Sequence, residues 1–220
     1  MFNKTTTMLC RIIILAMLSL VIGKVCAQTP HTHQHSFSNA SQWAQVFDDP
    51  ERDKWQQPHQ VIQALEIKPD SIVADIGSGT GYFATRLAHM VPQGAIYGVD
   101  AEPEMVNFLK ERAEKLGLKN LYSIQGSAES PRLPKKVDLI LFVDVYHHIE
   151  KRIGYLKAVR SSLNDGGRIA VIDFRQDSPI GPPVKDRFSS SQVVEEFKQA
   201  GFSLIKENEF LPNQYFLIFK

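Results

Sequence analysis

Apolar and polar positions from Pro58 onward follow two periods in turn. Short runs of consecutive apolar residues are typical of strands covered on both faces, and stretches with apolar residues every three or four positions are typical of amphipathic helices. The predicted strands are 71–76, 95–100, 121–125, 137–143 and 168–174. One predicted helix starts at Pro58, others cover 81–91, 102–117 and 150–163, and a turn is predicted at 164–167. Alternating strands and helices predict a parallel sheet with helices on both faces.

The end of the chain departs from this alternation. After a predicted helix at 190–200, two apolar runs at 202–211 and 214–219 are separated only by Pro212 and Asn213. So short a connection forces the two strands to be antiparallel. The predicted fold class is α/β: a Rossmann-like, doubly wound, mostly parallel seven-stranded sheet with a C-terminal antiparallel strand pair.

The first residues have a different pattern. Lys4 and Arg11 precede an apolar run from 12 to 22, and Val25-x-Ala27 follows it. This order is typical of a secretory signal peptide and predicts cleavage after Ala27, hence a periplasmic or secreted protein. The apolar run is shorter than the roughly 20 residues of a membrane span. An uncleaved anchor, which would add a membrane partner, and a misplaced start remain alternatives.

Removal of residues 1–27 changes the charge and the cysteine content. It leaves 22 of the 25 basic residues against all 24 acidic ones, a formal charge of −2, so no basic surface favours nucleic acid as a partner. Cys10 and Cys26 are also removed. The mature chain could then form no disulfide, no thiolate metal site and no cysteine nucleophile, and the lack of cysteine argues against arsenite methylation.

Residues 28–54 are predicted to be a linker and N-terminal cap segment. His31, His33 and His35 alternate in a polar stretch, and we interpret them as part of a solvated tail rather than as a metal site. The following stretch carries Trp43, Phe47 and Trp55, enough apolar surface to dock on a domain or to cover a cleft. Because the three histidines are assigned to a solvated tail, we predict no metal site.

The glycines of "VADIGSGTGYF", residues 73–83, connect the first predicted strand to a helix. In doubly wound sheets ligands bind at the carboxyl ends of the strands. Glycines there let backbone amides come close to a ligand, and the helix amino end favours an anionic group. Asp75 precedes this bend, and Asp100 ends the second strand, where a carboxylate accepts both hydroxyls of a ribose. Together they favour an adenosine ligand with a charged amino-acid tail over a simple tight turn with Asp100 as a helix cap.

Five motifs in order extend this interpretation: "VADIGSGTGYF", "IYGVDAEPEM", "IQGSAE", "VDLILFVDVYHHI" and "LNDGGRIAVIDF". Their order and spacing, from about residue 58 to 220, resemble the class I S-adenosylmethionine-dependent methyltransferases. The subgroup is similar to the small type 11 and ubiquinone/menaquinone-biosynthesis methyltransferases. The resemblance implies that 55–220 is the methyltransferase domain and that S-adenosyl-L-methionine is its cofactor.

The resemblance also implies roles for single residues. Asp75 would lie near the methionine amino group and Asp100 would take the ribose hydroxyls. The family often has an acid where this chain has Ser127. The cofactor-binding residues implied in this way are Asp75, Gly77, Ser78, Gly79, Gly81, Asp100, Ala101, Glu102, Ser127 and Ala128.

Methyl transfer from a sulfonium is an in-line displacement, so the protein must chiefly hold the two reactants in line. A base is needed only if the acceptor loses a proton. The candidates follow two strand ends: Asp144, His147, His148 and Asp173, with His147 and Asp144 predicted to be the catalytic pair. Tyr146 is a candidate for the cleft wall. Arg175 and Arg187, in the long loop that follows, are available for an anionic acceptor.

Two other functions remain open from the sequence. An NAD-dependent oxidoreductase would use G-x-G-x-x-G, whereas the spacing here is G-x-G-x-G. A degenerate methyltransferase fold that binds a ligand without catalysis would suit an exported chain, because S-adenosylmethionine is made in the cytosol. The acceptor is expected to be a small molecule of unidentified chemistry, and the sequence does not determine the oligomeric state.

Overall fold

A computed structural model describes residues 39–220. The predicted signal peptide, its cleavage after Ala27 and the His31, His33 and His35 stretch lie outside the described residues and stay predictions. Within 39–220, no helix has the length and apolar character that crossing a membrane requires.

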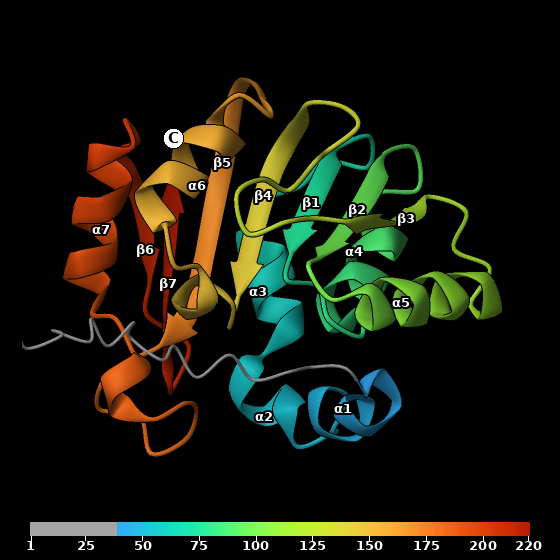
Figure 1. Cartoon of the computed structure of the whole chain (residues 1–220), viewed down its shortest axis with the longest axis horizontal. Coiled ribbons are helices and arrows are strands. Elements are labelled where there is room, and N and C mark those ends of the chain that lie inside the picture. Colours follow the sequence, from blue (N-terminus) through green and yellow to red (C-terminus); the bar gives the residue numbers. More distant parts are fainter. Residues whose placement is uncertain (1–38) are drawn as a thin grey trace, which may run out of the picture. The chain divides into compact units, whose positions relative to one another are not determined.

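A seven-stranded sheet in the order β3-β2-β1-β4-β5-β7-β6 forms the centre of the domain (Figure 1). Its first five strands pair in parallel, and β7 is antiparallel to both β5 and β6. The predicted fold class is therefore confirmed. The strands are β1 (Ile72–Ile76), β2 (Ala95–Asp100), β3 (Leu121–Gln125), β4 (Val137–Val143), β5 (Leu163–Phe174), β6 (Leu204–Asn208) and β7 (Gln214–Phe219).

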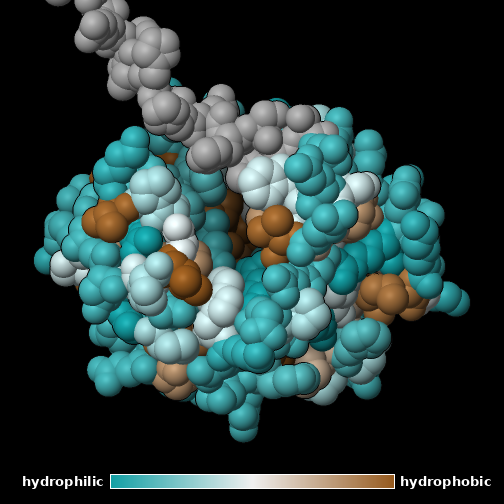
Figure 2. Space-filling model, turned by 90° about the horizontal axis from the view of Figure 1, so that it is seen from below, coloured by the Kyte–Doolittle hydropathy of each residue, from teal (hydrophilic) through white to brown (hydrophobic). Residues whose placement is uncertain are grey.

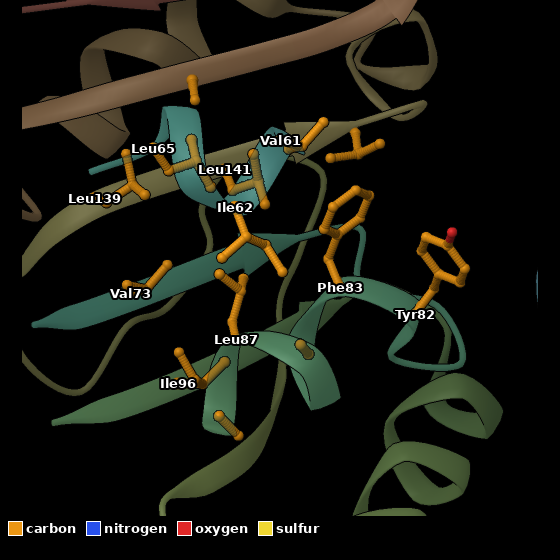
Figure 3. Close-up of a cluster of buried hydrophobic side chains, with 14 of the residues drawn as sticks. Val61, Ile62, Leu65, Val73, Tyr82, Phe83, Leu87, Ile96, Leu139 and Leu141 are labelled. Carbon is orange, nitrogen blue, oxygen red and sulfur yellow. The ribbon is translucent and has the colours of Figure 1, made fainter. Parts of the chain in front are cut away.

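Helices cover both faces of this sheet. The first face buries side chains of α3, α4 and α5 against the strands, and the second face buries those of α6 and α7. Figure 3 shows the first cluster, in which Leu87 of α4 lies near Val73 of β1. The helices are α1 (Ala40–Phe47), α2 (Arg52–Gln56), α3 (Pro58–Ala64), α4 (Tyr82–Met90), α5 (Pro103–Lys115), α6 (Arg152–Arg160) and α7 (Ser190–Gln199), with short turns η1 (Tyr146–His148) and η2 (Val184–Asp186).

Two predicted element boundaries were wrong. The turn predicted at 164–167 lies inside β5 as a bulge, because Val137 pairs with Leu163 while Leu139 already pairs with Arg168. The strand predicted at 202–211 ends at Asn208, so residues 209–213 rather than two residues connect β6 to β7. The longer connection keeps the antiparallel pairing.

Residues 39–57, the described part of the segment before Pro58, form two short helices. These helices, α1 and α2, lie at the edge of the sheet where β1, β2 and β4 end (Figure 1). Asp48, just after α1, pairs with Arg112 of α5 at 2.8 Å, and Arg52 of α2 pairs with Asp144 at 3.3 Å. We call residues 39–57 the cap. It therefore packs directly against the edge at which the site residues were predicted.

Packing explains one glycine of the bend. Gly77 has φ +69°, and a Cβ placed on it would lie 2.2 Å from a Val145 methyl carbon. A residue with a side chain there would adopt a disfavoured backbone conformation, and its Cβ would overlap with Val145 in the segment that follows β4. Gly77 therefore holds β1 close to the segment after β4.

We predict that Gly77→Ala destabilises the fold by about 2 to 5 kcal/mol. The left-handed backbone costs about 1 to 2 kcal/mol for a residue with a side chain, and the overlap with Val145 adds about 1 to 3. Gly166→Ala is the matched control, because Gly166 has φ +80° but nothing within 4 Å of its Cβ position. Urea unfolding of both variants measures the difference. Equal losses would contradict the packing argument, and Val145→Ala should recover part of the Gly77→Ala loss.

Candidate functional site

The glycine bend is held to the end of β2 by its own amides. The N–H groups of Gly77 and Ser78 both donate to the carbonyl of Val99, and that of Gly81 donates to Ser78. The Gly79 N–H donates to the Asp100 carboxylate at 2.9 Å. In this structure these four amides shape the bend, and the predicted contact of its residues with a cofactor stays a prediction.

Asp100 lies directly against the bend. One carboxylate oxygen accepts from Gly79, and the other accepts from the Glu102 N–H at 3.0 Å. Burial raises the pKa of this carboxyl, and the backbone hydrogen bonds oppose the rise. An ionised carboxylate has about four acceptor positions, so two more hydroxyl groups can bind to it.

Two hydroxyls of the bend have no hydrogen-bond partner among the described residues. Ser78 Oγ and Thr80 Oγ1 are both buried in this state. Such groups are costly to bury unpaired, and they are therefore suited to a polar ligand. The Phe47 ring of the cap lies over the same bend, 3.4 Å from where a Gly79 Cβ would stand. Asp75 and Asp100 can accept from ammonium and hydroxyl groups, Ser78 and Thr80 can bind further polar atoms, and Phe47 covers the bend. This combination fits an adenosine that carries an amino-acid tail.

Asp75 at the end of β1 is buried, with 3% of its surface exposed. Burial raises its pKa to about 7, and the positive charge of Arg52 opposes the rise most strongly. Because its pKa is about 7, the Asp75 carboxyl is partly protonated near neutral pH.

Asp144 follows β4 in a left-handed conformation, with φ +56°. Its two oxygens accept from Arg52 at 3.3 Å and from the Gln214 side chain. Gln214 in turn accepts from Gln56 at 2.7 Å, and Gln56 accepts from Arg52, so four side chains form a closed ring. Burial raises the Asp144 pKa, with Arg52 opposing. A backbone conformation of this kind costs about 1 to 3 kcal/mol, which the ring must offset.

His147 and Asp173 form a buried pair. His147 Nδ1 lies 2.9 Å from both Asp173 oxygens, and the Phe174 N–H donates to the same carboxylate at 2.8 Å. Burial disfavours the charged imidazole, but the hydrogen bond and charge of Asp173 outweigh it and raise the His147 pKa. The carboxylate orients Nδ1 and leaves Nε2 for proton transfer. Only 7% of the His147 side chain is exposed, so just a group inside the site could reach it.

The remaining predicted residues have local roles. Glu102 stands at the N-cap position of α5 without a capping hydrogen bond from its side chain, and Ala101 lies between it and Asp100. Ser127 and Ala128 follow β3 beside β2, since the Gly126 N–H donates to the Asp100 carbonyl. The Ser127 hydroxyl accepts from the amides of Glu129 and Ser130, so it closes its own turn.

Three suggestions about the acceptor side were wrong. Tyr146 is fully buried and donates to Glu196 at 2.7 Å, so it belongs to the core rather than to the cleft wall. Arg187 donates to the carbonyls of residues 175, 176, 178 and 182. Arg175 donates to those of 211, 212 and 214. Both arginines thus fasten loops, and Arg175 also pairs with Asp177 at 3.2 Å, so most of their donors are already in use.

Sequence reasoning missed the side chains that complete the site. Arg52 and Gln56 lie in a charged stretch that resembles a solvated surface. Gln214 is the first residue of an apolar strand, and that position was the one available signal: an antiparallel strand begins at the edge where parallel strands end. A polar residue there faces the strand-end acids.

Figure 2 looks onto this edge and shows a recess with apolar residues inside it. Two cavities of about 560 and 230 Å³ lie elsewhere: the first near Asp70 and Tyr122, the second between Glu150 and Glu196. No cluster of three or more His, Cys, Asp or Glu side chains within 39–220 is arranged to hold a metal ion.

Comparison with known proteins agrees with this geometry. A family model described as "Methyltransferase domain" matches residues 67–212. The structure of a SAM-dependent methyltransferase from Aquifex aeolicus superimposes with a TM-score of 0.76 at 25% identity, covering 82% of this chain and 97% of that one. Protein-L-isoaspartate O-methyltransferase of Pyrococcus horikoshii is 37% identical, over 50% of this chain and 64% of that protein. The uncharacterized methyltransferase YcgJ of Bacillus subtilis is 30% identical, over 54% and 47%.

The chain belongs to the class I S-adenosylmethionine-dependent methyltransferase family, which makes S-adenosylmethionine its implied cofactor. It spans between 44% and 64% of the length of the first three curated relatives that it matches. These likenesses do not specify the type 11 subgroup, which stays a prediction. They lend no support to an NAD-dependent oxidoreductase or to a scaffold without catalysis.

We predict that Asp173→Asn lowers the pKa of His147. The carboxylate that raises this pKa would be gone, while the burial that lowers it would remain. Proton NMR titration of the histidine ring resonances measures the change in the ligand-free protein. Asp165→Asn, in the β5 bulge, is the control and should leave the His147 pKa unchanged. An unchanged His147 pKa would contradict the assigned pairing.

Proposed function

We propose that this chain binds S-adenosylmethionine over the glycine bend and transfers its methyl group to a small-molecule acceptor. The observation that carries the proposal is Asp100: it lies against the bend with acceptor positions left over, beside two buried hydroxyls without partners. Asp100 would take the ribose hydroxyls, Asp75 the methionine ammonium, and Ser78 and Thr80 further polar atoms.

The bound cofactor would supply an activated methyl group, so the chain's own task is chiefly to orient. The cap and the strand-end residues exclude water from the transfer. For an acceptor that must lose a proton, His147 is the proposed base, with Nδ1 fixed by Asp173. Asp144, already paired with Arg52 and Gln214, is proposed to orient the acceptor rather than to take its proton.

The acceptor itself is proposed only as a small molecule. Support comes from the enclosed site: both His147 and Asp173 are almost fully covered, and the cap lies over the bend. The isoaspartate relative acts on a protein, but its likeness covers half of this chain, so its acceptor is not carried over.

We predict that Asp100→Ala weakens binding of S-adenosylhomocysteine at least about tenfold. A lost hydrogen bond to a charged acceptor costs about 1.5 to 3 kcal/mol, and Asp100 would make two to the ligand besides shaping the bend. Isothermal titration calorimetry on the whole chain measures the affinity. Asp165→Ala, an exposed acid in the β5 bulge, is the control and should bind like the wild type. Equal affinity in the Asp100 variant would overturn the ribose contact, and no heat from the wild type would favour a scaffold without cofactor.

We further predict that S-adenosylmethionine binds about tenfold more tightly at pH 8 than at pH 6. The ammonium group of the ligand needs an ionised Asp75, whose pKa burial raises to about 7, so protons compete with the ligand below that pH. Asp75→Asn should bind weakly and without this pH dependence. Asp144→Asn separates the two buried acids: it should keep the slope. A slope that vanishes in the Asp144 variant instead would assign the titration to Asp144.

A further inference from the structure

The cap contains a polar atom for which the described residues supply no partner. Asp48, just after α1, pairs through one oxygen with Arg112 of α5 at 2.8 Å. Its other oxygen, Oδ1, is buried and has no hydrogen-bond partner among residues 39–220. A buried carboxylate oxygen without a donor is costly, so this atom is suited to a donor that comes with a ligand.

Asp48 lies beside the glycine bend. The Arg112 nitrogen that binds it also donates to the Thr80 carbonyl at 2.9 Å, so one guanidinium holds the acid next to the bend. The Thr80 hydroxyl is likewise buried without a partner among the described residues. Two buried oxygen atoms that lack partners therefore belong to residues that a single nitrogen connects.

Phe47, the residue before Asp48, brings the cap into contact with the same bend. Its ring carbons lie 3.4 Å from the position that a Gly79 Cβ would take, and the Gly79 N–H donates to Asp100 at 2.9 Å. The next step rests on the proposed function, in which Asp100 holds the ribose hydroxyls. A ligand held by Asp100 lies next to Gly79, and hence within reach of the two cap residues.

The cap residues either form a wall of the cofactor site or fill the space that the cofactor needs. Residues that fill a site in place of a ligand are expected to satisfy the polar atoms that they cover, because unpaired buried groups are costly. Here Asp48 Oδ1 and the hydroxyls of Ser78 and Thr80 lack partners although the cap is in place. The unpaired atoms therefore favour a wall.

We propose that Asp48 is a cofactor-binding residue: its Oδ1 accepts a hydrogen bond from an N–H or O–H group of the bound cofactor, and Phe47 packs against the same molecule. Arg112 then serves as a positioning residue, because it fixes the other oxygen of Asp48 and the Thr80 carbonyl. The family model matches only residues 67–212, so this contact belongs to the cap and not to the matched stretch.

Calorimetry with S-adenosylhomocysteine on the whole chain at pH 8 tests the contact. We expect Asp48→Ala to weaken binding about tenfold, because the ligand loses a hydrogen bond to a charged acceptor. Asp48→Ser, with its shorter and uncharged side chain, should do the same and covers the case in which the alanine variant does not fold. Asp49→Ala removes the neighbouring exposed acid and should bind like the wild type.

A double-mutant cycle separates a direct contact from an effect through Arg112. Arg112→Met removes the ion pair but keeps the Oδ1 of Asp48. In the Arg112→Met background, Asp48→Ala should still weaken binding at least about fivefold. A loss that disappears in this background means that Asp48 only supports Arg112 and overturns the proposal, as does an equal loss in Asp49→Ala.

Phe47→Ala distinguishes a wall from a filled site. Loss of a wall should weaken binding about fivefold, whereas emptying a filled site would strengthen it. Tighter binding by the Phe47 variant therefore overturns the proposal. If the wild type binds no S-adenosylhomocysteine, or Asp100→Ala binds it equally well, the proposed function has failed instead. If Asp100→Ala weakens binding and the Asp48 variants do not, the cap contact alone is overturned.

Discussion

Buried carboxylates at one edge of the sheet are the constraint on which the rest of this structure depends. Parallel strands that end together bring Asp75, Asp100, Asp144 and Asp173 to that edge, and each needs a donor or a cation nearby because an unpaired buried charge is prohibitively costly. Three of the four meet this need differently: Asp100 with amides, Asp173 with His147, and Asp144 with Arg52 and Gln214. The cap, η1 and the start of β7 are placed where these donors are required.

Because Asp100 needs donors, the glycine bend has two duties, one structural and one toward a ligand. The bend must approach β2 closely enough for its amides to meet Val99 and Asp100, and it must still offer polar atoms to a ligand. The hydroxyls of Ser78 and Thr80 have no partner among the described residues, and they are the atoms that we propose for the second duty. Substitutions at Asp100 will accordingly disturb both the shape of the bend and its chemistry.

The sequence predicted well what depends on local pattern. The alternation of strands and helices indicated the sheet, and the acids at strand ends could be assigned to one edge because parallel strands share that edge. It predicted poorly what depends on distant partners. Arg52, Gln56 and Gln214 form the ring around Asp144 only in the folded chain, and only the position of Gln214 at the start of its strand signals this role. The bulge in β5 was missed because Asn164 and the glycines after it resemble a turn, although strand pairing continues around them.

The hydrogen bond between Gln56 and Gln214 joins residues that are 158 positions apart. Contacts over such separations form late, since the intervening chain must first be ordered. During synthesis α2 is made long before β7, so the contact of Gln56 with Gln214 can form only once β7 is in place. The closed ring around Asp144 is completed at the same point.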